Sequence, residues 1–134
     1  MEFYTAAGVY INCKLYPFIV WILSGWKLYE TRTRRVLHPL IGQRVFLIET
    51  GNGRPMIIGS AKITEAEQVP YTDVTKRRLA QITGTTYDIK PGGAKWFYKL
   101  ESIKWLPEPI PAPDTRKNHG RSYCTWEAYR TREI

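Results

Sequence analysis

Five charged side chains lie close together in the sequence and could act on an anionic or polar ligand. They fall between residues 25 and 35 and are Lys27, Glu30, Arg32, Arg34 and Arg35. Four of them are cations, so the segment has a local excess of three positive charges. A carboxylate can orient neighbouring cations and accept hydrogen bonds from an amino group, while the cations can hold a phosphate. This segment is therefore the candidate site, and the alternative is an exposed Arg–Glu pair that only braces the fold.

Aromatic residues flank these charges and could stack on unpaired bases. Trp26 and Tyr29 are nearest in sequence, and each stacked base is worth about 1–3 kcal/mol. Arg34 and Arg35 adjoin them, so we expect both arginines to contact RNA phosphates at the rim of the site. Tyr98 and Trp126 are further candidates for stacking on bases, whereas Trp96 and Trp105 are expected to belong to the hydrophobic core.

The composition agrees with an anionic partner. The 134 residues include 20 Lys and Arg against 12 Asp and Glu, a formal net charge of +8, and 13% of them are aromatic. Basic and aromatic side chains together favour a partner such as RNA or a nucleotide. The longest apolar run, Phe18 to Leu23, has six residues, whereas a membrane helix needs about 20. We therefore expect one cytoplasmic domain with no membrane partner.

Cysteine and histidine are too few and too scattered to suggest a metal centre. The chain has Cys13, Cys124, His38 and His119, whereas a structural zinc site needs about four clustered ligands. We expect two reduced thiols, two loop histidines, and neither a metal nor a cofactor.

Three elements should position the charged segment. Residues 9–16 alternate apolar and polar side chains, which predicts a half-buried strand. Pro17 suits the start of a helix over residues 18–23, and Gly25 suits a left-handed cap after its end. Residues 28–33 are expected to form the next strand. Glu30 and Arg32 are two positions apart on it, so their side chains share a face.

The middle of the chain predicts a β-hairpin and then a second helix. Residues 44–49 and 56–63 read as its two arms around a glycine-rich turn. Gly59 lies within the second arm and suggests a bulge or a close backbone approach. Residues 71–82 change to a helical period.

The last third of the chain predicts more β-structure. Strands are expected at residues 94–105 and 121–126, and the prolines between residues 107 and 113 should keep that segment out of a central strand. Together the elements suggest a small mixed β-barrel with helices plugging its ends.

The segment from Pro17 to Arg32 resembles the signature of the ASCH domain family, a buried helix followed by a G-x-K-x-x-E-x-R motif. The motif residues are Gly25, Lys27, Glu30 and Arg32. The resemblance covers about residues 9–106 and implies an α+β, PUA-like fold, a small mixed β-barrel with two or three helices and a cleft lined by the motif. We expect a single domain over residues 1–134, with residues 107–134 as a proline-spaced segment and tail.

The resemblance implies an RNA- or nucleotide-binding module with a basic cleft around the motif. One group of small ASCH proteins, however, hydrolyses acylated cytidine with a Lys, a Thr three residues later and a distant Glu. Lys27 matches that Lys, Glu30 stands in the place of the Thr, and Glu65 is the candidate for the distant Glu. The alternative is therefore a hydrolase, either an amidohydrolase on a modified pyrimidine nucleoside or a ribonuclease, with Glu30 as general base. A third hypothesis is a protein-interaction domain that offers residues 107–113 as a ligand.

Overall fold

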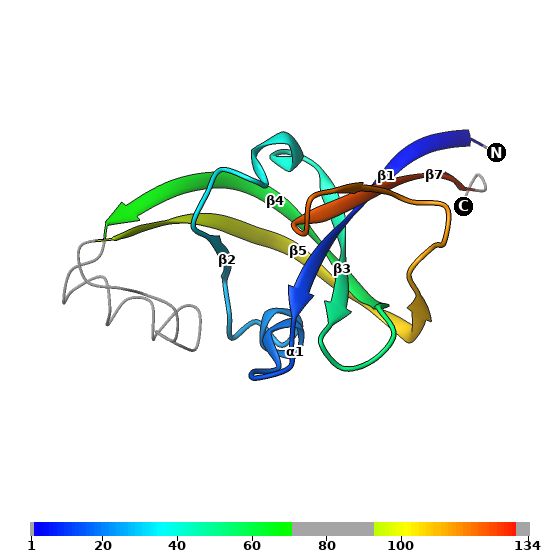
Figure 1. Cartoon of the computed structure of the whole chain (residues 1–134), viewed down its shortest axis with the longest axis horizontal. Helices are drawn as coiled ribbons and strands as arrows, with labels where there is room; N and C mark the ends of the chain where they lie inside the picture. Colours follow the sequence, from blue (N-terminus) through cyan, green and yellow to red (C-terminus); the bar gives the residue numbers. More distant parts are fainter. Residues whose placement is uncertain (1, 71–92, 131–134) are drawn as a thin grey trace.

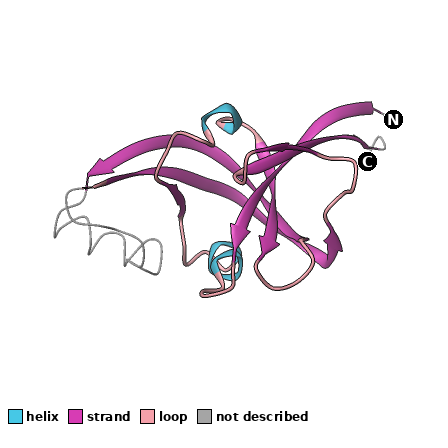
Figure 2. Ribbon diagram, viewed as in Figure 1, coloured by secondary structure: helices cyan, strands magenta, loops and turns pink. Residues whose placement is uncertain are grey.

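The computed structural model of the chain describes residues 2–70 and 93–130, and β-strands dominate it (Figures 1 and 2). In the described residues seven strands form one mixed sheet in the order β2-β5-β4-β3-β1-β7-β6. The strands are β1 (Glu2–Asn12), β2 (Tyr29–Arg32), β3 (Arg44–Thr50), β4 (Met56–Pro70), β5 (Ala94–Pro111), β6 (Lys117–His119) and β7 (Tyr123–Arg130).

The two ends of the described chain pair with each other inside the sheet, next to its outer strand β6. β1 pairs in parallel with β3, with Gly8 opposite Phe46, and antiparallel with β7, with Gly8 opposite Cys124. Figure 1 shows the start of β1 and the end of β7 side by side. The C-terminal strand expected near residues 121–126 is therefore part of the main sheet.

The hairpin predicted from the glycine-rich turn is confirmed as β3 and β4, and β4 continues into a long pairing with β5. The register of β4 against β5 shifts at Gly59. A Cβ atom on Gly59 would lie 2.5 Å from the carbonyl oxygen of Lys104. Both the bulge and the close backbone approach expected at this glycine are thus present.

The proline-spaced segment extends β5 to Pro111. There it pairs with β4, for example Ile57 with Ile110. β2 pairs with β5 much earlier, between Trp96 and Lys99. Pro107 and Pro109 fall in the irregular stretch between Trp105 and Ile110, where the pairing with β4 shifts register and β2 does not reach β5.

The expected small barrel with two or three helices is wrong. β2 and β6 are the outer strands of the order, and no pairing between them closes the sheet in residues 2–70 and 93–130. These two strands have four and three residues, which offers few hydrogen bonds for closure. One α-helix lies in the described ranges, α1 (Phe18–Leu23), as predicted, together with a single 3-10 turn at His38–Leu40. The helix expected over residues 71–82 lies outside the described residues.

Two clusters of buried apolar side chains form the core. The larger lies between α1 and the sheet and includes Ile19, Ile22, Leu47 and Tyr98. The smaller is built from Ile48, Ile57, Ala112 and Cys124. Trp126, a predicted stacking residue, is half-buried on the smaller cluster, with its ring centre 5.7 Å from that of Phe46. In the described part of the chain no helix is long and apolar enough to cross a membrane.

Candidate functional site

The turn after α1 places Lys27 inside the protein. Gly25 adopts φ +84°, a left-handed conformation that favours glycine, so the predicted cap is confirmed. The backbone N–H groups of Trp26 and Lys27 then both donate to the carbonyl of Trp21, at 2.9 Å each. The turn leaves Lys27 2% exposed, with its Nζ 5.2 Å from the centre of the Phe18 ring.

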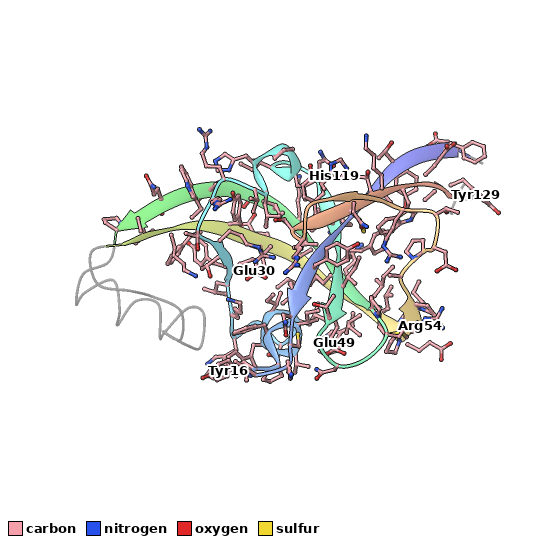
Figure 3. All side chains as sticks on the ribbon, in the orientation of Figure 1. Tyr16, Glu30, Glu49, Arg54, His119 and Tyr129 are labelled. Carbon is pink, nitrogen blue, oxygen red and sulfur yellow. The ribbon has the colours of Figure 1, made fainter. Side chains whose placement is uncertain are left out.

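Glu30 is buried between two cations. It lies opposite Tyr98 in the β2–β5 pairing, is 6% exposed, and appears in Figure 3 on β2. Its Oε1 accepts a hydrogen bond from the backbone N–H of Thr31 at 3.0 Å and lies 3.9 Å from Nζ of Lys27. Its Oε2 lies 3.1 Å from Nη1 of Arg32. Lys27, Glu30 and Arg32, called the motif cluster below, therefore converge.

The charges of the motif cluster keep Glu30 ionised. Burial raises the pKa of Glu30, but Arg32, then Lys27, and the backbone N–H of Thr31 together bring it below its usual value. Oε2 is ion-paired with Nη1 of Arg32, but that nitrogen is also hydrogen-bonded to the carbonyl of Thr31 at 3.0 Å, and Oε2 accepts no well-aligned hydrogen bond among the described residues. The site therefore contains a buried, charged acceptor with unused capacity.

Arg32 also ties β2 to β1. Its Nη2 donates to the carbonyl of Tyr10 at 2.8 Å. β1 and β2 are not neighbours in the sheet, so this hydrogen bond joins two strands that backbone pairing leaves apart. Both terminal nitrogens of Arg32 are engaged with main-chain carbonyls, which fixes the guanidinium as a support for Glu30.

A second group of side chains lies on the same face of the sheet. It consists of Arg35, His38, Trp96 and Tyr98 and is called the Arg35 group. Nε of Arg35 donates to Nε2 of His38 at 3.3 Å, and Nδ1 of His38 lies 2.7 Å from the hydroxyl of Tyr98. The Arg35 guanidinium carbon lies 5.5 Å from the centre of the Trp96 ring. In the pairing of β2 with β5, Trp96 lies opposite Arg32 and Tyr98 lies opposite Glu30. The Arg35 group and the motif cluster are therefore neighbours.

The sequence did not place His38 and Trp96 beside the candidate site. His38 was expected to be a loop histidine and Trp96 a core residue, and Trp96 does pack against the larger core cluster. His38 and Tyr98 are 60 residues apart in the chain. The signal that joins them is the register of β2 against β5, which local patterns do not specify.

Two predicted site residues lie on the other face of the sheet. Tyr29 and Glu65 are both opposite Lys99, from the two neighbouring strands. Because adjacent residues in a strand point to opposite faces, their side chains point away from the face of Glu30. Tyr29 packs on Phe97 with ring centres 5.5 Å apart, and Glu65 is exposed. The structure does not bring either residue to the motif cluster.

The exposure of each aromatic side chain decides whether it can have the stacking or core role predicted for it. Trp26 is 55% exposed beside the buried lysine, and its ring meets that of Trp21 edge-on at 4.9 Å. Tyr98 is fully buried, so the prediction of a stacking role for its ring is wrong. Trp105 is 53% exposed, so its assignment to the core is also wrong. Its indole N–H donates to the carbonyl of Leu23 at 3.1 Å, which holds the ring at the surface.

Cys13 and Cys124 are both free and buried, as expected. Burial raises the pKa of the Cys13 thiol, which keeps it protonated and unreactive. Within residues 2–70 and 93–130, no three His, Cys, Asp or Glu side chains gather in a way that could hold a metal ion.

Comparison with known proteins gives matches among solved structures. No protein-family model and no curated protein sequence matches the chain. A crystal structure of ASCH from Zymomonas mobilis is 21% identical with a TM-score of 0.60, and the match covers 78% of this chain and 73% of that one. A serine-to-alanine variant from the same organism is 19% identical (TM-score 0.57, coverage 79% and 73%), and a tyrosine-to-phenylalanine variant 21% identical (TM-score 0.55, coverage 78% and 75%). At these identities the likeness establishes the fold, and the ASCH resemblance seen in the sequence is confirmed at that level.

Proposed function

Because this chain has the ASCH fold, we propose that it is an RNA- or nucleotide-binding module whose site is the motif cluster of Lys27, Glu30 and Arg32. The observation that carries the proposal is Oε2 of Glu30, which is buried beside two cations and is ion-paired with Arg32 but keeps acceptor capacity for a further donor. A ligand N–H that donates to Oε2 adds a charge-assisted hydrogen bond in a buried site. Nucleobases present such amino groups on their edges.

Arg34, Arg35 and Trp26 supply contacts for the rest of such a ligand. Both arginines are exposed and follow the motif cluster directly, where they add charge for a phosphate backbone. Trp26 presents an exposed ring next to the buried lysine, and unpaired bases stack on rings of this kind. The proposal therefore combines one buried polar contact with exposed cationic and aromatic contacts.

A hydrolase acting on RNA or a modified pyrimidine nucleoside is the second candidate. The burial of Lys27 beside Glu30 favours it, because a buried cation can stabilise negative charge that develops on a substrate oxygen. Two observations favour binding without chemistry instead. The lowered pKa of Glu30 makes its carboxylate a weak general base. Glu65 points to the other face of the sheet.

Titration of a labelled, mixed-sequence single-stranded RNA, followed by fluorescence anisotropy, tests the binding proposal. We expect the logarithm of the affinity to fall linearly with the logarithm of the salt concentration. Glu30→Gln removes a negative charge, which by itself strengthens non-specific RNA binding, so a weaker affinity identifies Glu30 as a ligand contact. Glu101→Gln is the matched control, since Glu101 forms an exposed ion pair with Lys99. Wild-type protein that binds neither RNA nor mononucleotides at low salt contradicts the proposal.

Incubation with acylated cytidine and with RNA separates the two candidates. The binding module is expected to leave both compounds intact. Lys27→Met keeps the length of the side chain and removes its charge. Turnover by the wild type that disappears in a folded Lys27→Met variant would establish the hydrolase and end the binding-only proposal.

A further inference from the structure

Arg35 is held in one orientation by two neighbours. The Trp96 ring lies 5.5 Å from its guanidinium carbon, and Nε2 of His38 accepts a hydrogen bond from its Nε at 3.3 Å. His38 is itself packed edge-on against Trp96, with ring centres 4.7 Å apart and planes at 87°. Arg35 lies in the connection between β2 and β3, whereas Trp96 belongs to β5. The guanidinium therefore packs against a side chain of the sheet.

The hydrogen bonds around His38 define which ring nitrogen carries its proton. Nε2 accepts from Arg35, so in a neutral ring the proton lies on Nδ1 and is donated to the Tyr98 hydroxyl at 2.7 Å. The backbone N–H of Leu37 donates to the same hydroxyl at 3.3 Å. Tyr98 is fully buried in the core, so this chain of hydrogen bonds anchors the imidazole to a rigid part of the protein.

The terminal nitrogens of Arg35 are free to bind a ligand. Neither Nη1 nor Nη2 has a hydrogen-bond or ion-pair partner within the described residues, and the side chain is exposed. An arginine fixed through Nε and stacked on an aromatic ring presents its two Nη groups as a ready fork for a phosphate. Arg34, its exposed neighbour, carries the same charge but has no hydrogen-bond or ion-pair partner among residues 2–70 and 93–130.

We propose that Arg35 is a pre-oriented contact for a backbone phosphate of the bound RNA and that His38 is the residue that positions it. This inference rests on the proposed RNA-binding function and assigns distinct roles to two adjacent arginines. A pre-oriented side chain loses less conformational freedom on binding than a mobile one. Arg35 therefore contributes more to affinity than Arg34, although each carries one positive charge.

Fluorescence anisotropy with a mixed-sequence single-stranded RNA at low salt tests the assignment. Arg35→Ala is expected to reduce affinity about tenfold and the matched control Arg34→Ala about twofold. His38→Ala should lower affinity severalfold in the wild-type background and have no further effect when Arg35 is already Ala, since the two residues act as one unit. Equal losses for Arg34→Ala and Arg35→Ala overturn the inference.

His38→Gln provides the positive control, because its amide oxygen can accept from Nε of Arg35 in place of Nε2 of the imidazole. We expect it to bind RNA as the wild type does. It also covers the case in which His38→Ala fails to fold. A folded His38→Gln variant that binds RNA as weakly as Arg35→Ala contradicts the positioning role.

NMR of the ring nitrogens separates failure of this inference from failure of the proposed function. Without RNA, the neutral His38 ring is expected to carry its proton on Nδ1, and titration with inorganic phosphate should shift the Arg35 side-chain signals more than those of Arg34. If the protein binds no RNA, these two results still decide the orientation and anion affinity of Arg35. A proton on Nε2, or no phosphate response at Arg35, refutes the inference whether or not RNA binds.

Discussion

Glu30→Gln tests whether the motif cluster is held together by a buried carboxylate charge. The substitution keeps the side-chain volume, so it opens no cavity, but it leaves Nζ of Lys27 and the Arg32 guanidinium without an anion at 3.9 Å and 3.1 Å. Removing one partner of a buried ion pair costs about 3–5 kcal/mol of unfolding free energy. The Arg32 side chain retains 20% of its exposure, and water relieves part of the loss. We therefore expect a destabilisation near the lower limit, about 3 kcal/mol.

The size of this destabilisation should depend on pH. The pKa of Glu30 in the folded protein lies below its usual value of 4.5. The carboxylate therefore stabilises the fold at pH values above 4.5, and this stabilisation is lost as the pH falls through the lowered folded-state pKa. Gln does not titrate. The difference in stability between wild type and variant should be largest at neutral pH and shrink in acid.

Urea unfolding monitored by tryptophan fluorescence, at neutral and at acidic pH, measures both effects. Glu101→Gln is the control, since the carboxylate of Glu101 is 48% exposed and its ion pair with Lys99 is screened by water. Domains of this size are stable by about 5–15 kcal/mol, so Glu30→Gln should still fold. A destabilisation no larger than that of the control, or a difference that stays constant as the pH falls, refutes the argument that Glu30 is a buried, charged partner.

Three further predictions concern the turn, the bulge and the exposed ring near the site. Gly59→Ala should destabilise the fold by about 1–3 kcal/mol, because its Cβ would lie 2.5 Å from the Lys104 carbonyl oxygen, and urea unfolding measures this. Gly25→Ala meets no atom within 4 Å, but φ is +84°, so we expect a smaller loss of about 1–2 kcal/mol by the same assay. A larger loss at Gly25 than at Gly59 would contradict this ordering. Trp26→Ala should weaken RNA binding by about 1–3 kcal/mol in anisotropy titrations and leave the unfolding midpoint unchanged. An unaltered affinity would exclude Trp26 as a stacking residue.

Local features of the chain could be predicted because their causes lie within a few residues. The bounds of α1, the left-handed cap at Gly25 and the bulge at Gly59 follow from apolar runs and glycine. The strand periods could be predicted for the same reason, although β1 both begins and ends earlier than expected, and β4 and β5 extend further. The open sheet could not be predicted, and the expected barrel was wrong, since closure depends on whether two short outer strands pair with each other across the sheet.

The sequence by itself determined the order of charges from Lys27 to Arg35 and the glycine cap after α1, whereas the inward direction of Lys27 came from the structure. Only the tertiary structure decided that Glu30 is buried with a spare acceptor, because burial and desolvation depend on packing against β5 and on the hydrogen bond from Arg32 to β1. It also decided that His38 lies against a strand 60 residues away. Periodicity specifies which face of a strand is apolar, whereas the choice of partner strand and register emerges from long-range pairing.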